Sequence, residues 1–335
     1  MVSPSYPVRV AVIGAGYWGR KVIREILDLS RTSGNVALHA VADSSPEILE
    51  ECQREFGNLD YRLDYRTLLS DPELAGVHIC TPNSSHFEVA SAFLNSGKHT
   101  LVEKPLTLNS SEAYDLVRQA KTNGTVLCTG FIHRFNNGVK ELRRAINTGV
   151  LGELYFLRIE WTGFLLPQSQ REVITDLAPH PFDIANYLLN DWPEDITCRA
   201  KGFRTKENEE VAFIQSEYSN GLCIQTEVNW LDRQKRRDVT VVGSEGSARL
   251  DCGTQTGILQ RRDGMEKVDI TPSNTLRAEI SHFIDCIMHN VRSEPISNFS
   301  DGLLGAEVVT LLETARESLR QRRTIPVRFP RFPVA

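Results

Sequence analysis

Asp176 and His180 stand four residues apart in the segment ITDLAPHPFDI. A carboxylate and an imidazole at this spacing can bind a metal ion, cap a helix or work as an acid/base pair. A metal site would need further ligands at matching spacing, and the eight histidines show no such constellation, so we predict no metal. Two interpretations of His180 stay open. It is either a base that takes the proton released when an alcohol is oxidised, or a buried structural histidine.

Two prolines, Pro179 and Pro181, limit how this pair is arranged. Proline has no N–H and disrupts a helix interior, so both fit only in the first turn of a helix that begins near Ala178. Asp176 then lies just outside that helix, and the strict i, i+4 geometry of one helix does not apply. The sequence leaves the distance between carboxylate and imidazole open.

A glycine-rich turn, Gly14-x-Gly16-x-x-Gly19, follows an apolar segment and opens a helical pattern. In that context the motif predicts a dinucleotide-binding turn. Gly14 permits the tight turn, Gly16 lets the backbone approach a pyrophosphate, and Gly19 lets helix and strand pack closely. The helix N-terminus adds N–H donors and the positive end of its dipole. The alternative is a glycine-rich turn that binds no ligand.

Asp43 follows the second apolar segment, where an acidic side chain accepts hydrogen bonds from the ribose hydroxyls of adenosine. A carboxylate there repels a 2′-phosphate, and the next residue is Ser44 rather than arginine. The sequence therefore favours NAD over NADP. An additional role for Asp43 as the cap of the helix that opens at Pro46 is compatible with this function.

The elements that must position these residues alternate between strand and helix over the first third of the chain. Trp18, Val22, Ile26 and Leu29 form the apolar stripe of the first helix. This alternation predicts a doubly wound parallel sheet of the Rossmann type with right-handed crossovers. We expect its strands at 8–13, 36–42, 76–80, 99–102 and 125–129.

Beyond about residue 130 the pattern changes. A helix at 137–148 precedes strand segments between 153 and 262 that are separated by Asn-Gly, Gly-Ser and Asp-Gly turns, and two helices follow at 276–290 and 301–320. We predict an α+β second domain with a large, mostly antiparallel open sheet. The expected domains are 1–128 for dinucleotide binding and 129–335 for substrate binding and oligomerisation.

The composition excludes several classes of partner. The net charge of −5 over 335 residues includes no long basic block, which argues against nucleic acid or an anionic membrane as partner. The longest apolar segments are too short and too often interrupted by charge to span a bilayer. Seven scattered cysteines with no C-x-x-C spacing are typical of reduced thiols, so we predict a cytoplasmic protein.

Two further motifs follow the strands at 76–80 and 99–102, on the edge where a doubly wound sheet binds its ligand. They are Thr81-Pro82-Asn83-x-x-His86 and Glu103-Lys104-Pro105. In order with the GAGYWG turn, Asp43 and Asp176-x-x-x-His180, they resemble the Gfo/Idh/MocA family of NAD(P)-dependent sugar and cyclitol dehydrogenases. The resemblance covers essentially the whole chain.

The resemblance implies roles for these residues. Lys104 would face substrate and cofactor, often beside a cis proline bond, and its ammonium would stabilise a forming alkoxide. His180 would be the general base, with Asp176 orienting it or binding a substrate hydroxyl. Without the resemblance, Glu103-Lys104 is equally typical of a surface ion pair. The implied NAD-binding residues are Gly14, Gly16, Tyr17, Trp18, Gly19, Asp43, Thr81, Pro82, Asn83, His86, Glu103 and Lys104.

The segment GFIHRFNNGVKELRRAINTGVLGEL resembles a stretch in nucleotide-sugar 3-dehydrogenases of this family, although Asn137 stands where those proteins often have proline. Arg134 would contact a phosphate or carboxylate, or pair with an acid of its own domain. The resemblance implies a UDP-sugar or another phosphorylated or acidic sugar, bound by Arg134, Asp176 and His180.

We therefore predict an NAD-dependent oxidoreductase that acts on a ring hydroxyl or ketone of a sugar, at C3 of a nucleotide sugar in the narrowest form. The resemblance also implies a homodimer or homotetramer formed through the open sheet. Two alternatives stay open. One is a redox-assisted glycoside hydrolase, and the other is a non-catalytic NAD-binding regulator, a kind of relative that tends to lose the lysine or the histidine.

Overall fold

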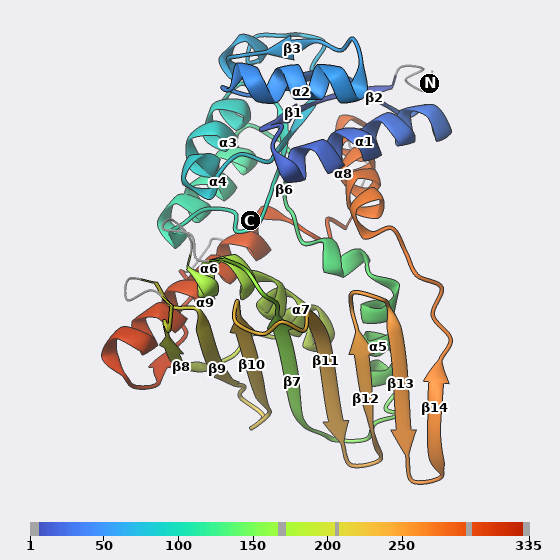
Figure 1. The fold of residues 1–335 in the computed structure, drawn as a ribbon, viewed down its shortest axis with the longest axis vertical. Coiled ribbons are helices and arrows are strands. Elements are labelled where there is room, and N and C mark those ends of the chain that lie inside the picture. Colours follow the sequence, from blue (N-terminus) through green and yellow to red (C-terminus); the bar gives the residue numbers. More distant parts are fainter. Residues whose placement is uncertain (1–6, 167–171, 205–207, 293–296, 331–335) are drawn as a thin grey trace. The chain divides into compact units, whose positions relative to one another are not determined.

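The computed structural model describes residues 7–166, 172–204, 208–292 and 297–330. The chain forms two compact units, shown in Figure 1, of which one comprises residues 1–132 and 275–306 and the other 133–274 and 307–335. The first change of unit lies a few residues beyond the expected boundary at 128. The return of the chain to the first unit at Thr275 is not part of the predicted division.

The first unit contains a six-stranded sheet in the order β3-β2-β1-β4-β5-β6, with every neighbouring pair parallel. The strand order reverses direction beyond β1, which is the doubly wound Rossmann arrangement and confirms the predicted fold class. The strands are β1 (Val8–Ile13), β2 (Val36–Ala42), β3 (Tyr61–Arg62), β4 (Gly76–Ile79), β5 (His99–Val102) and β6 (Leu127–Thr129).

The helices of this unit begin and end as their local sequence dictates. On α1, Val22, Ile26 and Leu29 are buried, as the apolar stripe predicts. The Ser45 hydroxyl caps α2 by accepting the Ile48 amide at 3.2 Å. The helices are α1 (Tyr17–Thr32), α2 (Pro46–Phe56), α3 (His86–Asn95), α4 (Ser110–Thr122) and α8 (Thr275–Arg292).

Helix α8 follows the second sheet in sequence but packs in the first unit (Figure 1). Its Ile280 and Phe283 join the same core as Val22 and Ile26 of α1. Arg277 donates to Glu25 and Asp28 of α1 at 3.0 and 2.9 Å. The apolar periodicity predicted a helix here, but periodicity does not say which core an apolar face joins.

The second unit contains a nine-stranded sheet in the order β14-β13-β12-β11-β7-β10-β9-β8-β15. Only β7 and β10 pair in parallel, so the sheet is mostly antiparallel, as predicted. The strands are β7 (Leu154–Thr162), β8 (Asp195–Lys201), β9 (Val211–Glu217), β10 (Cys223–Asn229), β11 (Arg236–Gly243), β12 (Gly246–Asp251), β13 (Thr256–Arg261), β14 (Gly264–Val268) and β15 (Ile325–Pro326).

One face of this sheet is covered by helices and the other is open. Along β9, Ile214 and Ser216 are buried, whereas Phe213, Gln215 and Glu217 are exposed on the opposite face. This alternation is expected when only one face packs on a core. The helices are α5 (Asn137–Asn147), α6 (Val173–Leu177), α7 (Pro179–Leu189) and α9 (Gly302–Gln321). No helix in the described part of the chain is long and apolar enough to cross a membrane.

Replacing Leu101 with alanine tests the core of the first unit. Leu101 is completely buried on β5, so we expect Leu101→Ala to lower the free energy of unfolding by about 2–5 kcal/mol. Leu63→Ala is the matched control, because Leu63 is 57% exposed and its truncation should change stability by less than about 0.5 kcal/mol. Urea denaturation followed by circular dichroism measures both. Equal losses would contradict the assigned core.

Candidate active site

The turn between β1 and α1 has no room for side chains at two of its glycines. Gly14 has φ +90°, and a Cβ there would lie 2.7 Å from the backbone of Cys80 and Thr81. A Cβ on Gly19 would lie 1.9 Å from the carbonyl oxygen of Gly14. Both glycines are therefore required by the close packing of β1, α1 and the end of β4.

Gly16 is different, because the protein itself does not require a glycine there. A Cβ at Gly16 would meet nothing within 4 Å, and its φ of −67° is open to any residue. Space at the N-terminus of a helix, lined by backbone N–H groups, is what a pyrophosphate needs. The cradle therefore fits the dinucleotide that the motif predicts.

The Asp43 carboxylate, at the end of β2, is hydrogen-bonded to the glycine turn. Its Oδ2 accepts the Ala15 amide at 2.7 Å, and its Oδ1 accepts the Ser45 amide at 3.0 Å. These bonds fix the carboxylate beside the glycine turn. This position is compatible with the predicted bonds to ribose hydroxyls, which stay a prediction.

Every predicted cofactor residue lies in the first unit, just beyond the end of a strand. Residues 14–19 follow β1, Asp43 follows β2, 81–86 follow β4, and Glu103 and Lys104 follow β5. The carboxyl ends of parallel strands share one edge of the sheet, which is where doubly wound folds bind ligands. Tyr17 is 74% exposed at the start of α1, and Lys21 Nζ lies 4.3 Å from the centroid of its ring.

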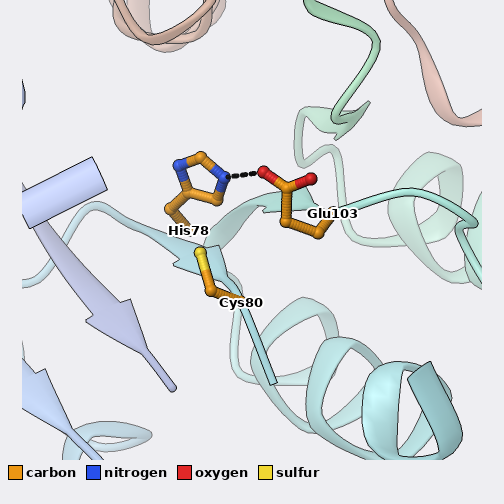
Figure 2. A group of neighbouring side chains, drawn as sticks. All are labelled: His78, Cys80 and Glu103. Carbon is orange, nitrogen blue, oxygen red and sulfur yellow. Dashed lines mark hydrogen bonds and ion pairs between the residues drawn. The ribbon is translucent and has the colours of Figure 1, made fainter. Parts of the chain in front are cut away.

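Glu103 is held by two N–H donors. The Trp18 indole N–H donates to its Oε1. The His78 Nε2 lies 3.2 Å from the same oxygen (Figure 2). Gly130 packs on the same side chain, since a Cβ there would lie 2.9 Å from Glu103 Oε2. The turn that presents Lys104 is thereby joined to the glycine turn through Trp18.

Figure 2 shows His78 and Glu103 beside Cys80. The atoms of these three side chains that could bind a metal lie within 4.8 Å of one another. In the described residues this is the one group of His, Cys and carboxylate that could hold a metal ion. Burial raises the pKa of the Cys80 thiol well above its usual value, which disfavours the thiolate that a metal would need. The hydrogen bonds account for the arrangement, and the absence of metal stays a prediction.

His86 joins the two motif loops. Its Nδ1 lies 2.8 Å from the carbonyl oxygen of Pro105, and its Nε2 lies 3.0 Å from that of Thr81. The ring is completely buried, and burial lowers the pKa of His86 while the two carbonyls oppose the shift. The Lys104–Pro105 peptide bond is cis, as the resemblance implied.

Asp176 and His180 lie on two consecutive helices of the second unit. Asp176 is in α6, and α7 begins at Pro179 after Ala178. Both prolines thus occupy the first turn of α7, as predicted, with the Phe182 amide bonded to the Ala178 carbonyl at 3.1 Å. Asp176 is outside α7 but inside a short helix of its own, so the pair does not share a single helix.

His180 belongs to an aromatic cluster that the sequence did not reveal. Its ring lies edge-on to His133 at 5.0 Å and 5.7 Å from the Trp161 ring. Arg237 stacks over Trp161 at 5.0 Å. Burial lowers the pKa of Arg237, and the Asp176 carboxylate opposes that shift. His180 therefore shares one cluster with a second imidazole and an indole. Arg237 and Asp176 add a guanidinium and a carboxylate, and such groups are suited to a polyhydroxylated ligand.

Arg134 bonds to α7 within its own unit. Its Nε donates to Asp183 at 2.5 Å, and its Nη2 donates to Asn186 at 2.7 Å. Burial raises the pKa of Asp183 to about 6, although Arg134 opposes the rise. The pairing with an acid of its own domain is thus present, and the substrate contact of Arg134 stays a prediction.

Family models match both halves of the chain. The oxidoreductase family with an NAD-binding Rossmann fold matches residues 8–131, and the GFO/IDH/MocA C-terminal domain matches residues 139–249. The chain belongs to the Gfo/Idh/MocA oxidoreductase family. This confirms the predicted family, the NAD-binding fold and the class of enzyme.

Relatives in the Gfo/Idh/MocA family act on sugars. The chain is 28% identical to the UDP-N-acetylglucosamine 3-dehydrogenase of Acidithiobacillus ferrooxidans, over 94% of this chain and 99% of that one. It is 30% identical to the D-glucoside 3-dehydrogenase of Escherichia coli over 55% of each protein. A solved structure of the Acidithiobacillus enzyme, 27% identical, superposes with a TM-score of 0.82 over 93% of this chain and 98% of that chain.

Substitution of Gly16 tests whether the turn between β1 and α1 binds the pyrophosphate of NAD. Because a Cβ there meets no protein atom, Gly16→Val should fold normally yet weaken NAD binding roughly tenfold or more by filling the space of the pyrophosphate. Calorimetric titration with NAD measures the affinity. Gly163→Ala is the control, because its Cβ would meet only ordinary contacts near 3.7 Å. Unchanged affinity in Gly16→Val would contradict the assigned cradle.

Asp183 predicts a pH dependence of stability. Its raised pKa means that the folded state binds a proton more tightly than the unfolded state. The stability contributed by Asp183 should therefore fall as pH rises from about 4, its ordinary range, through about 6. Denaturation of wild type and Asp183→Asn across this window measures the effect. As the pH rises through this window, the free energy of unfolding of wild type should fall relative to that of Asp183→Asn. A difference in free energy that stays constant with pH would contradict the raised pKa of Asp183.

Proposed function

We propose that this chain is an NAD-dependent dehydrogenase of a ring hydroxyl in a sugar, working on a nucleotide sugar at C3. One observation carries the proposal. Lys104 follows Glu103, which Trp18 and His78 hold by hydrogen bonds, at the ligand-binding edge of the first sheet. His180 lies in a polar and aromatic cluster of the second unit. The chain that carries both residues is similar over 94% of its length to a nucleotide-sugar 3-dehydrogenase.

The chemistry divides among a few groups. The turn at Gly14, Gly16 and Gly19, together with Asp43, would hold NAD, which would supply the acceptor for the hydride of the carbinol carbon. His180 takes the hydroxyl proton, a task to which an imidazole side chain is suited because it can both accept and release a proton. The Lys104 ammonium stabilises the negative charge that develops on the oxygen.

Asp176 and Arg237 orient the substrate in this proposal. Asp176 interacts electrostatically with Arg237, whose guanidinium is held on the Trp161 ring. A carboxylate held in this way can accept a bond from a sugar hydroxyl, and an indole face commonly packs on apolar faces of a ligand. Arg134 is assigned to the phosphate or acidic part of the substrate.

The proposed assembly is a homodimer or homotetramer through the open face of the second sheet. Phe213 is 55% exposed there, and its neighbours on β9 alternate with buried residues. The proposal rests on the resemblance and on this uncovered sheet face, which a second copy of the chain would cover. We assign the protein to the cytoplasm because all seven cysteines are free.

The proposed dehydrogenase activity is tested by measuring the turnover of a panel of sugars by wild type and by variants. NADH formation should appear with one or more of UDP-sugars, sugar phosphates and inositols. Lys104→Met should lower kcat/KM by about 10²–10³, and His180→Asn should lower kcat by about 10²–10⁴. Lys140→Met and His39→Gln, which change the same residue types elsewhere, should leave both parameters unchanged.

Two outcomes would contradict the dehydrogenase. Release of a chromogenic aglycone from a glycoside without net NADH would indicate a redox-assisted hydrolase. NAD binding with no turnover of any sugar, together with a cellular phenotype that survives Lys104→Met, would indicate a regulator.

A further inference from the structure

Two thiols from distant parts of the chain meet in the first unit. Cys128 lies on β6 and Cys286 on α8. One cluster of side chains joins them, in which Cys128 Sγ donates to Asn298 Oδ1 at 3.4 Å. His282 Nε2 lies 3.4 Å from the same oxygen and 3.5 Å from Cys286 Sγ. Each cysteine is 1% exposed. The backbone around Cys128 is fixed, because the Thr129 amide donates to the Ser300 carbonyl at 2.7 Å.

His282 lies one turn before Cys286 on α8, with its Nε2 3.5 Å from Cys286 Sγ. The Phe299 amide donates to the same Nε2 at 3.1 Å. A backbone N–H can only donate, so this nitrogen is the unprotonated one and the Cys286 thiol donates to it. The ring is held in place by stacking on Phe299 at 5.2 Å. Cys286 thus has a positioned base.

The two thiols differ in character. The neighbouring Cys128 thiol and the His282 ring lower the pKa of Cys286, and burial opposes them. Burial, with a further contribution from the neighbouring Cys286, raises the pKa of Cys128 well above its usual value. A thiol that loses its proton readily, beside one that keeps its proton, is the arrangement of a nucleophilic and a resolving cysteine.

A cavity of about 430 Å³ adjoins Cys286. Its other lining residues include Leu127, Asn290, Asn298 and Asp301. Such a volume admits a small polar molecule, so a buried thiol at this wall is reachable by a small oxidant.

We propose that Cys286 and Cys128 form a reversible disulfide when the protein meets a small peroxide. His282 takes the Cys286 proton, and the thiolate attacks one peroxide oxygen, breaking the O–O bond and releasing water to leave a sulfenic acid. The Cys128 thiol then attacks that sulfur and displaces a second water. Two thiols lose two electrons and two protons, and hydrogen peroxide becomes two molecules of water. The proposal is independent of the sugar substrate.

The test is to treat the native protein with hydrogen peroxide at pH 7, block remaining thiols with N-ethylmaleimide, and map peptides by mass spectrometry. We expect a peptide that links Cys128 to Cys286, lost after dithiothreitol. Cys52→Ser is the control and should keep the link, because Cys52 is buried on α2 and burial raises its pKa. Absence of the link in wild type overturns the proposal.

A second measurement separates the roles of the two thiols. In Cys128→Ser, the sulfenic acid on Cys286 has no partner, so labelling of Cys286 by dimedone should rise above that of wild type. In Cys286→Ser, both link and dimedone label should be lost, and thermal melting shows whether each variant is folded. Equal dimedone labelling in wild type and Cys128→Ser would overturn the assignment of Cys128 as the resolving thiol.

Discussion

The turn between β1 and α1 has to pass so close to the end of β4 that neither Gly14 nor Gly19 can carry a Cβ. This constraint sets the angle at which α1 leaves the sheet, and with it the direction of its free N–H groups. Asp43 then reaches the Ala15 amide, and Trp18 reaches Glu103 in front of Lys104. The open space at Gly16 and the position of Lys104 are thus consequences of one tight contact.

Much of the fold could be predicted from local patterns. The strand and helix alternation of the first unit, the helix start at the two prolines near His180 and the mostly antiparallel second sheet all follow from periodicity and turn residues. The packing of α8 in the first unit could not be predicted from these local patterns. Its apolar face fits any complementary core, and the choice of α1 depends on Phe283 and on the pairing of Arg277 with Glu25 and Asp28.

The candidate site likewise has a part that the sequence predicts and a part that it does not. The glycine motif and Glu103-Lys104-Pro105 are contiguous in sequence, so their chemistry was recognisable. The cluster around His180 is not contiguous. His133, Trp161 and Arg237 come from three segments, and only the second sheet brings them together. His78 was equally hidden, because a histidine within a buried strand gives no sign of the carboxylate it will meet.

All of these residues serve the transfer of a hydride between a sugar carbon and NAD. The most direct measurement uses UDP-N-acetylglucosamine with deuterium at C3, incubated with the enzyme and NAD and followed by NMR of the nicotinamide. We expect deuterium at C4 of the reduced nicotinamide on a single face, and slower turnover than for the unlabelled sugar. Reduced nicotinamide that carries no deuterium, or NAD that stays oxidised with this and every other sugar tested, would contradict this hydride transfer.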